Sequence, residues 1–310
     1  MKLLWLDLNS SYAHSSLALP ALHAQIADDT TIEWCIVSAT INENTGMVVS
    51  RIHKHRPDII AATNWLFNHE QLLHIISRAK ALLPHCCIVL GGPEFLGNNE
   101  AFLYKNKFVS GVFRGEGEEV FPQWLKVWNH SKETWKSITG LCYLDENGRY
   151  QDNGIARVMN FSQLVSPEKS CFFNWSKPFV QLETTRGCFN TCAFCVSGGE
   201  KPVRTIPLEA IRERLNDIHQ HGIKNVRVLD RTFNYNNKRA KELLDLFRQY
   251  PDICFHLEIH PALLSEELKQ ELSVLPKGLL HLEAGIQSLK ESVLQQSRRI
   301  GKLSDALEGL

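Results

Sequence analysis

The chain has 310 residues, and Lys plus Arg equals Asp plus Glu at 34 each, so its formal net charge is zero. Nothing in this balance points to nucleic acid or to an anionic membrane surface as a partner. The apolar stretches are only as long as strands, and the first residues turn acidic early, so we expect neither a membrane span nor a secretory signal. Nine cysteines without a disulfide spacing lead us to expect a reducing compartment, the cytoplasm.

Residues 1–128 alternate strand-like and helix-like segments, and several of the strands are continuously apolar. Such runs are typical of parallel strands with helices on both faces. The alternation predicts an α/β fold, a doubly wound parallel sheet of Rossmann-like type, with a ligand at the carboxyl ends of the strands. The expected strands are 2–8, 31–37, 58–65, 86–92 and 111–115, and the expected helices are 15–26, 47–55, 69–83 and 118–128.

Two glycine-containing strings follow the fourth and fifth of these strands. They read GGPEF, from Gly91 to Phe95, and RGEGEE, from Arg114 to Glu119. Glycines directly after a buried strand allow a bulky ligand to approach the backbone. A double glycine is often only a turn, so each string by itself is a weak signal.

Residues 129–177 break the alternation and are polar and rich in turn signals. Two alternating stretches, 138–145 and 156–161, flank the turn DENGRYQDNG and predict a small hairpin. We therefore expect a first domain at 1–128, a linker with a hairpin at 129–177, and a second domain at 178–310.

In the second domain strands and helices alternate again. This order predicts the start of a (β/α) barrel, whose chemistry belongs at the carboxyl ends of its strands. The expected strands are 180–185, 225–233, 253–260 and 279–288, the expected helices are 208–220, 238–250 and 264–275, and the final segment is expected to be mostly helical.

The strongest signal in the chain is the string TTRGCFNTCAFCVSGG, which overlaps the end of the first strand of that domain. Its cysteines, Cys188, Cys192 and Cys195, are separated by three residues and then by two. Three thiolates on one loop can converge on a metal centre, and a cubane iron–sulfur cluster, which normally takes four, would then keep one iron open. Zinc is the alternative, but it needs a fourth ligand. The nearest candidates, His219 and His221, fit better at the end of a polar helix.

The string TTRGCFNTCAFC resembles the cluster loop of radical S-adenosylmethionine (SAM) enzymes. The GGP and GEGE strings, in this order and at this separation, resemble the cobalamin-binding domain that precedes the radical SAM core in many of them. The resemblance implies that the three cysteines hold a [4Fe–4S] cluster, that SAM binds the fourth iron, and that cobalamin binds the first domain. It also implies an external electron donor such as flavodoxin or ferredoxin. The expected reaction is methylation or rearrangement of a substrate that the sequence does not identify.

The resemblance also implies roles for residues near the strand ends. Those expected to bind SAM are Phe194, Gly198, Gly199, Asp230, Glu258, Glu283, Gln287 and Arg298, and the sequence does not separate Arg298 from Arg299. Those expected to bind cobalamin are His14, Asn64, Gly91, Gly92, Pro93, Gly115, Glu116 and Gly117. The loop around His14 departs from the Asp-x-His-x-x-Gly pattern of many cobalamin domains, so we expect cobalamin to bind without a histidine ligand. Asp230 stands where the family usually has a GGE-type element, which makes it a substitute.

The second domain offers about four of the six strands of a radical SAM barrel. We expect either a shortened product or a partner chain that closes the barrel, because the edge of the fourth strand would otherwise expose backbone donors. Two other functions stay open, namely an inactive relic that binds cobalamin or a cluster, and a methylthiotransferase that acts on RNA. The latter would need further cluster cysteines, and Cys35, Cys86 and Cys87 have the wrong spacing.

Overall fold

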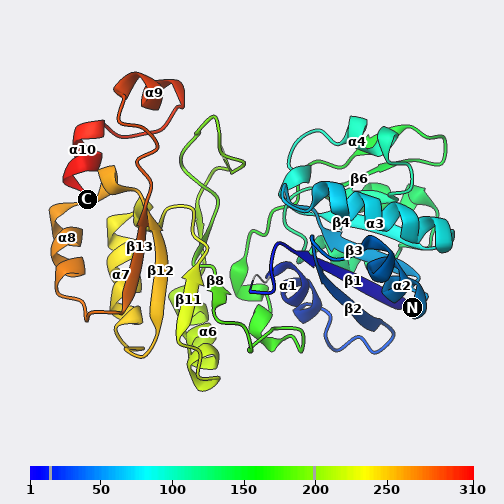
Figure 1. The fold of residues 1–310 in the computed structure, drawn as a ribbon, viewed down its shortest axis with the longest axis horizontal. Coiled ribbons are helices and arrows are strands. Elements are labelled where there is room, and N and C mark those ends of the chain that lie inside the picture. The colour runs from blue at the N-terminus through cyan, green and yellow to red at the C-terminus, as the bar shows by residue number, and fades with distance from the viewer. Residues whose placement is uncertain (14–15, 198–199) are drawn as a thin grey trace. The chain divides into compact units, whose positions relative to one another are not determined.

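A computed structural model describes residues 1–13, 16–197 and 200–310 of the chain. The chain divides into two compact units, Met1–Phe173 and Asn174–Leu310, each with its own main sheet (Figure 1). No helix in the described ranges is both long enough and apolar enough to cross a membrane.

The first unit is built on a seven-stranded sheet with the order β2-β1-β3-β4-β5-β6-β7. Strands β1 to β5 are parallel, and their order confirms the doubly wound sheet. The strands are β1 (Lys2–Asn9), β2 (Glu33–Thr40), β3 (Ile59–Thr63), β4 (Cys87–Gly91), β5 (Gly111–Phe113), β6 (Leu141–Leu144) and β7 (Tyr150–Asp152). The α-helices are α1 (Ala18–Ala24), α2 (Thr45–His55), α3 (His69–Leu82), α4 (Glu100–Lys105) and α5 (Val120–Leu125), and the 3-10 turns are η1 (Pro93–Phe95), η2 (Lys132–Ser137), η3 (Phe161–Gln163) and η4 (Pro167–Lys169).

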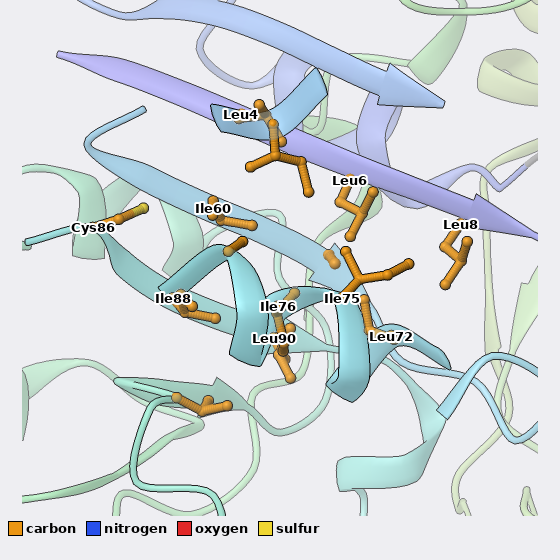
Figure 2. Packing of buried hydrophobic residues seen from close by; sticks show 14 of the residues in the cluster. Leu4, Leu6, Leu8, Ile60, Leu72, Ile75, Ile76, Cys86, Ile88 and Leu90 are labelled. Carbon is orange, nitrogen blue, oxygen red and sulfur yellow. The ribbon is translucent and has the colours of Figure 1, made fainter. Parts of the chain in front are cut away.

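Both faces of this sheet are buried, which is why its strands are continuously apolar. Successive side chains of β1 point to opposite faces. Leu4, Leu6 and Leu8 belong to the core formed with α2, α3 and α4 (Figure 2). Leu3 and Trp5 belong to a second core formed with α1 and α5. A helix layer on each face fixes the carboxyl ends of β1 to β5 as one common edge of the sheet.

The expected hairpin forms, but its second strand is β7 and not the stretch 156–161. The cause is a tight turn, because the Asp145 carboxylate accepts hydrogen bonds from the backbone N–H groups of Asn147 and Arg149, at 2.9 and 2.8 Å. The chain therefore returns at once, and β6 pairs with both β5 and β7 in antiparallel fashion. The hairpin thus extends the first sheet.

The second unit contains a sheet of four parallel strands that lie side by side in chain order, β8, β11, β12 and β13. This is the expected start of a (β/α) barrel. The strands are β8 (Val180–Leu182), β9 (Thr185–Arg186), β10 (Arg204–Thr205), β11 (Asn225–Val228), β12 (Cys254–Ile259) and β13 (Leu280–Ala284). The α-helices are α6 (Leu208–Gln220), α7 (Asn237–Phe247), α8 (Glu266–Ser273), α9 (Glu291–Gln296) and α10 (Leu303–Glu308), and the 3-10 turns are η5 (Phe233–Tyr235) and η6 (Pro261–Leu263).

One face of the β11 to β13 sheet is apolar and packs on helices. The ring of Phe255 in β12 stacks on Phe247 of α7, with ring centroids 4.1 Å apart. Since side chains alternate along a strand, His256 and Glu258 lie on the opposite face, where both are half-buried.

Candidate functional site

The cysteine loop, defined here as residues 187–197, begins where the first strand of the second unit breaks. The expected strand 180–185 ends at Leu182, and Thr185 pairs instead with β10 in a short separate ribbon. The cause is Asp230, which is 1 % exposed and accepts hydrogen bonds from the backbone N–H groups of Thr184 and Thr185 at 2.8 and 2.9 Å, and from the Thr184 hydroxyl. These bonds turn the backbone away from the sheet two residues before Gly187.

The loop closes on itself at Gly187. This residue has φ +92°, and a Cβ there would lie 2.4 Å from the carbonyl oxygen of Glu200. That same carbonyl accepts the backbone N–H of Cys188 at 3.0 Å. Only glycine allows this approach, because the positive φ and the short contact both exclude a side chain.

Cys188 and Cys192 are buried, and Cys195 is exposed. Burial raises the pKa of the Cys188 thiol, and repulsion from Cys195 and Cys192 raises it further. The backbone N–H of Asn190 and the Arg231 guanidinium act in the opposite direction on that pKa. Across the described ranges, no three His, Cys, Asp or Glu side chains are grouped closely enough to hold a metal. The chemistry of the donors still fits an iron–sulfur cluster, since three reduced thiols on one loop interact electrostatically.

The two histidines that zinc would need stay on a helix. His219 lies in the last turn of α6, and His221 follows as its C-terminal cap. The ring of His221 stacks on Trp175 with centroids 3.7 Å apart, and its Nδ1 lies 2.8 Å from the carbonyl oxygen of Asp217. This placement agrees with their interpretation as the end of a polar helix.

The residues expected to bind SAM occupy several environments. Phe194 is 58 % exposed, and Gln287 is exposed with φ +72°. Asp230 is occupied by Thr184 and Thr185, and burial raises its pKa while these hydrogen bonds oppose the rise. Gly198 and Gly199 lie outside the described residues.

Glu258 and Glu283 are register partners on β12 and β13. The carboxylate of Glu283 lies 2.9 Å from Nε2 of His256 and 3.6 Å from the Arg227 guanidinium. All four side chains therefore belong to the polar face of the sheet. That face can bind a polar group by charge and hydrogen bonding.

The structure separates Arg298 from Arg299. Arg298 is exposed and has φ +55°, whereas Arg299 is half-buried and donates to the carbonyl oxygen of Gly285 at 2.6 Å. Arg299 also lines a small pocket with His260 and Gly301.

His260 is the most unusual side chain of that pocket. It is 4 % exposed, and neither ring nitrogen has a hydrogen-bond partner among the residues that the structure describes. Burial and the charge of Arg299 lower the pKa of His260 to about 4. Asn234, itself buried, holds the His260 backbone by accepting its N–H at 2.8 Å and donating to its carbonyl at 2.9 Å. A neutral, unpaired imidazole beside a fixed guanidinium gives this pocket both a donor and an acceptor.

In the first unit, the loops after β3, β4 and β5 carry the residues expected to bind cobalamin. Asn64 is fully buried and lies against His69, with its Nδ2 3.1 Å from Nδ1 of that ring. Gly92 has φ +111°, and a Cβ there would lie 2.5 Å from the carbonyl oxygen of Asn64. A Cβ on Gly91 would make an ordinary van der Waals contact, 4.0 Å from Cβ of Phe113, and Pro93 begins η1.

The loop after β5 packs against the return segment of the same unit. Gly115 forms an isolated parallel bridge with Ala156. The carboxylate of Glu116 accepts the backbone N–H of Val158 at 2.7 Å, and the ideal Cβ of Gly117 lies 2.9 Å from the Leu22 side chain. His14 lies outside the described residues.

The cysteines outside the loop are placed as structural residues. Cys86 is 3 % exposed within the first core, and burial raises the pKa of its thiol to about 12. Burial likewise raises the pKa of Cys87 and of Cys35.

Sequence reasoning did not identify Asn190, and it named Asp230 for a different role. These polar side chains hold backbone groups of segments distant in sequence, and no local pattern encodes such partners.

Comparison with known proteins agrees with the division of the chain into two units. The B12 binding domain family matches residues 8–125, and the Radical SAM superfamily matches residues 182–310. An uncharacterized methyltransferase of Pyrococcus horikoshii is 29 % identical over 201 residues, covering 62 % of this chain and 43 % of that protein. A hopanoid C-3 methylase of Methylococcus capsulatus is 24 % identical over 270 residues, covering 82 % and 50 %.

Among solved structures, the cobalamin-dependent SAM radical enzyme OxsB, with aqua-cobalamin and SAM bound, matches with a TM-score of 0.80 at 17 % identity. That match covers 99 % of this chain and 47 % of OxsB. The chain therefore spans about half the length of the curated relatives and of the solved structure that it matches.

Proposed function

Because this chain belongs to the radical SAM proteins that carry a B12-binding domain, we propose that it cleaves SAM to begin a radical reaction and transfers a methyl group to an unidentified substrate. The cofactors that this pair of domains implies are a [4Fe–4S] cluster, SAM and cobalamin. The observation that carries the proposal is the cysteine loop. Three reduced thiols lie on one loop at the carboxyl end of the sheet, where a (β/α) barrel performs its chemistry.

When bound, these groups would supply the electron that splits the SAM sulfonium and the methyl group that is transferred. The residues of this chain would hold these groups in place. Cys188, Cys192 and Cys195 would hold the cluster, with two of the thiols shielded from water. The Arg299 guanidinium, fixed on Gly285, would bind the SAM carboxylate in preference to the exposed Arg298. The exposed ring of Phe194 is available to stack on adenine.

The carboxyl edge of the first sheet supports cobalamin binding by its exposed apolar surface. Gly91 at this edge carries no side chain, and a Cβ there would lie at an ordinary contact distance, 4.0 Å, from Cβ of Phe113. In the loop after β3, the rings of Trp65 and Phe67 stack 6.2 Å apart, and Leu66 is 82 % exposed. Parallel strands end at one edge, so this apolar surface and Gly91 belong to the same side of the sheet, as a corrin would require.

Anaerobic reconstitution with iron and sulfide, followed by SAM and a chemical reductant, tests the proposal. We expect the loaded protein to release 5′-deoxyadenosine, and Cys192→Ala to lower that rate at least about 100-fold because the cluster loses one of its ligands. Cys171→Ala is the matched control, since Cys171 is exposed and lies outside the loop. A loaded cluster that releases no 5′-deoxyadenosine would support an inactive relic instead.

The remaining expectations follow from the same proposal. Flavodoxin or ferredoxin would replace the chemical reductant, and adding either to the assay measures this directly. The nine cysteines, whose spacing does not suit a disulfide framework, support a reducing compartment, the cytoplasm.

A further inference from the structure

The cysteine loop is bonded to a turn more than 100 residues further along the chain. This arginine turn, defined here as residues 297–300, follows α9. The backbone N–H of Ala193 donates to the carbonyl oxygen of Ser297 at 2.9 Å. The backbone N–H of Ile300 donates to the side-chain oxygen Oδ1 of Asn190 at 3.2 Å. Both ends of the arginine turn are therefore attached to the cysteine loop.

The arginine turn has a conformation that needs support. Arg298 has φ +55°, which places a residue with a side chain in the left-handed region. Such residues persist only where surrounding contacts hold them. The two bonds from the cysteine loop are made on either side of Arg298, at Ser297 and Ile300. The next residue, Arg299, donates to the carbonyl oxygen of Gly285, just after β13.

Asn190 is the side chain that makes this connection. It is 4 % exposed although it lies in a loop, so its amide is committed to the protein interior. It lies two residues after Cys188 in the cysteine loop, and its side-chain oxygen accepts the backbone N–H of Ile300. A single buried side chain thus joins the cysteine loop to the arginine turn.

We infer that Asn190 is a positioning residue that fixes the arginine turn relative to the cysteine thiols, and so sets the affinity for SAM. The inference rests on the proposed function, because it assigns Arg299 to the SAM carboxylate. SAM would then bind two groups at once, the open iron and the guanidinium. The separation of these two groups is held by the Asn190 hydrogen bond together with the backbone bond from Ala193 to Ser297. Losing one such bond should weaken SAM binding by about 3- to 10-fold.

Two variants and one control separate this role from a general effect on folding. Asn190→Ala removes the oxygen that accepts from Ile300, and Asn190→Asp keeps an acceptor of the same size. Thr191→Ala changes the neighbouring, exposed position of the same loop. The first readout uses the protein without cofactors, namely hydrogen exchange at the Ile300 amide. We expect exchange to become about tenfold faster in Asn190→Ala and to stay unchanged in Asn190→Asp and Thr191→Ala.

The second readout is equilibrium binding of SAM to the reconstituted protein, with iron content measured alongside. We expect Asn190→Ala to raise the Kd for SAM by about 3- to 10-fold at unchanged iron content. Unchanged Kd and unchanged Ile300 exchange in Asn190→Ala would overturn the inference, as would an equal loss in Thr191→Ala. If wild-type protein binds SAM but does not cleave it, the proposed function fails. The effect of Asn190→Ala on the affinity for SAM can still be measured in that case.

Discussion

The loops after β4 and β5 in the first unit are shaped by close backbone packing, whereas the cysteine loop of the second unit is fastened by side-chain oxygens. Gly92 lies against the backbone of Asn64 and leaves no room for a Cβ. The cysteine loop has one such backbone contact, at Gly187, but it depends in addition on Asp230 and Asn190, two buried side chains that accept backbone N–H groups. The first arrangement requires the absence of a side chain, and the second requires a particular oxygen. The two regions should therefore fail under different substitutions.

The largest effect is expected for Asp230→Asn in the second unit. Oδ1 of Asp230 accepts both backbone N–H groups, those of Thr184 and Thr185, and the other oxygen accepts the Thr184 hydroxyl. An amide loses the negative charge that strengthens all three bonds, and it sets its NH2 group against the Thr184 hydroxyl. We expect the free energy of unfolding of this unit to fall by about 3 kcal/mol. Hydrogen exchange of the β11 and β12 amides measures this loss. The control is Asp252→Asn, because the Asp252 side chain is 65 % exposed. A loss below about 1 kcal/mol would mean that Asp230 does not fasten the loop.

A somewhat smaller effect is expected for Gly92→Ala in the first unit. Its φ of +111° and ψ of 177° belong to a region that residues with a side chain essentially avoid, and the new Cβ would meet Asn64. The expected cost is about 2 kcal/mol. Urea denaturation followed by tryptophan fluorescence checks it. Gly97→Ala in the same loop should be neutral, since no atom lies within 4 Å of its ideal Cβ. Equal stability of the two variants would show that backbone packing does not shape this loop.

The smallest effect is a dependence on pH that comes from His260. Its pKa in the folded protein is about 4, below the ordinary value of 6.5. Between these values the unfolded chain binds more protons, so the contribution to stability is complete above pH 6.5 and is lost as the pH falls toward 4. The second unit should lose about 1.5 kcal/mol between pH 6.5 and 5. His260→Gln should remove most of this slope in denaturation measured at both pH values. An unchanged slope in that variant would assign the effect to other groups.

Sequence reasoning predicted the elements well because both sheets depend on local periodicity. The continuously apolar strands of the first unit and the alternating β12 strand are visible in short windows. The cysteine spacing is equally local. The family matches support both the predicted α/β organisation and the interpretation of the cysteine spacing.

The sequence could not predict the strand ends that depend on hydrogen bonds to residues far along the chain. Thr184 and Thr185 have high strand propensity, yet Asp230, about 45 residues later, draws their N–H groups out of the sheet. The same holds for the hairpin, where the Asp145 carboxylate shortens the turn. Asn190 looks like any polar residue between two cysteines until Ile300 is seen beside it.

The central claim is that the first unit binds cobalamin and that the cysteine loop of the second unit binds an iron–sulfur cluster. The most direct measurement is the corrin and iron content of the protein produced with cobalamin and purified without oxygen. The account predicts about one corrin and about four iron atoms per chain, with the iron lost and the corrin kept when Cys188, Cys192 and Cys195 are all replaced by Ala. Iron content that is the same in the triple variant, or a chain that never retains corrin, would contradict it.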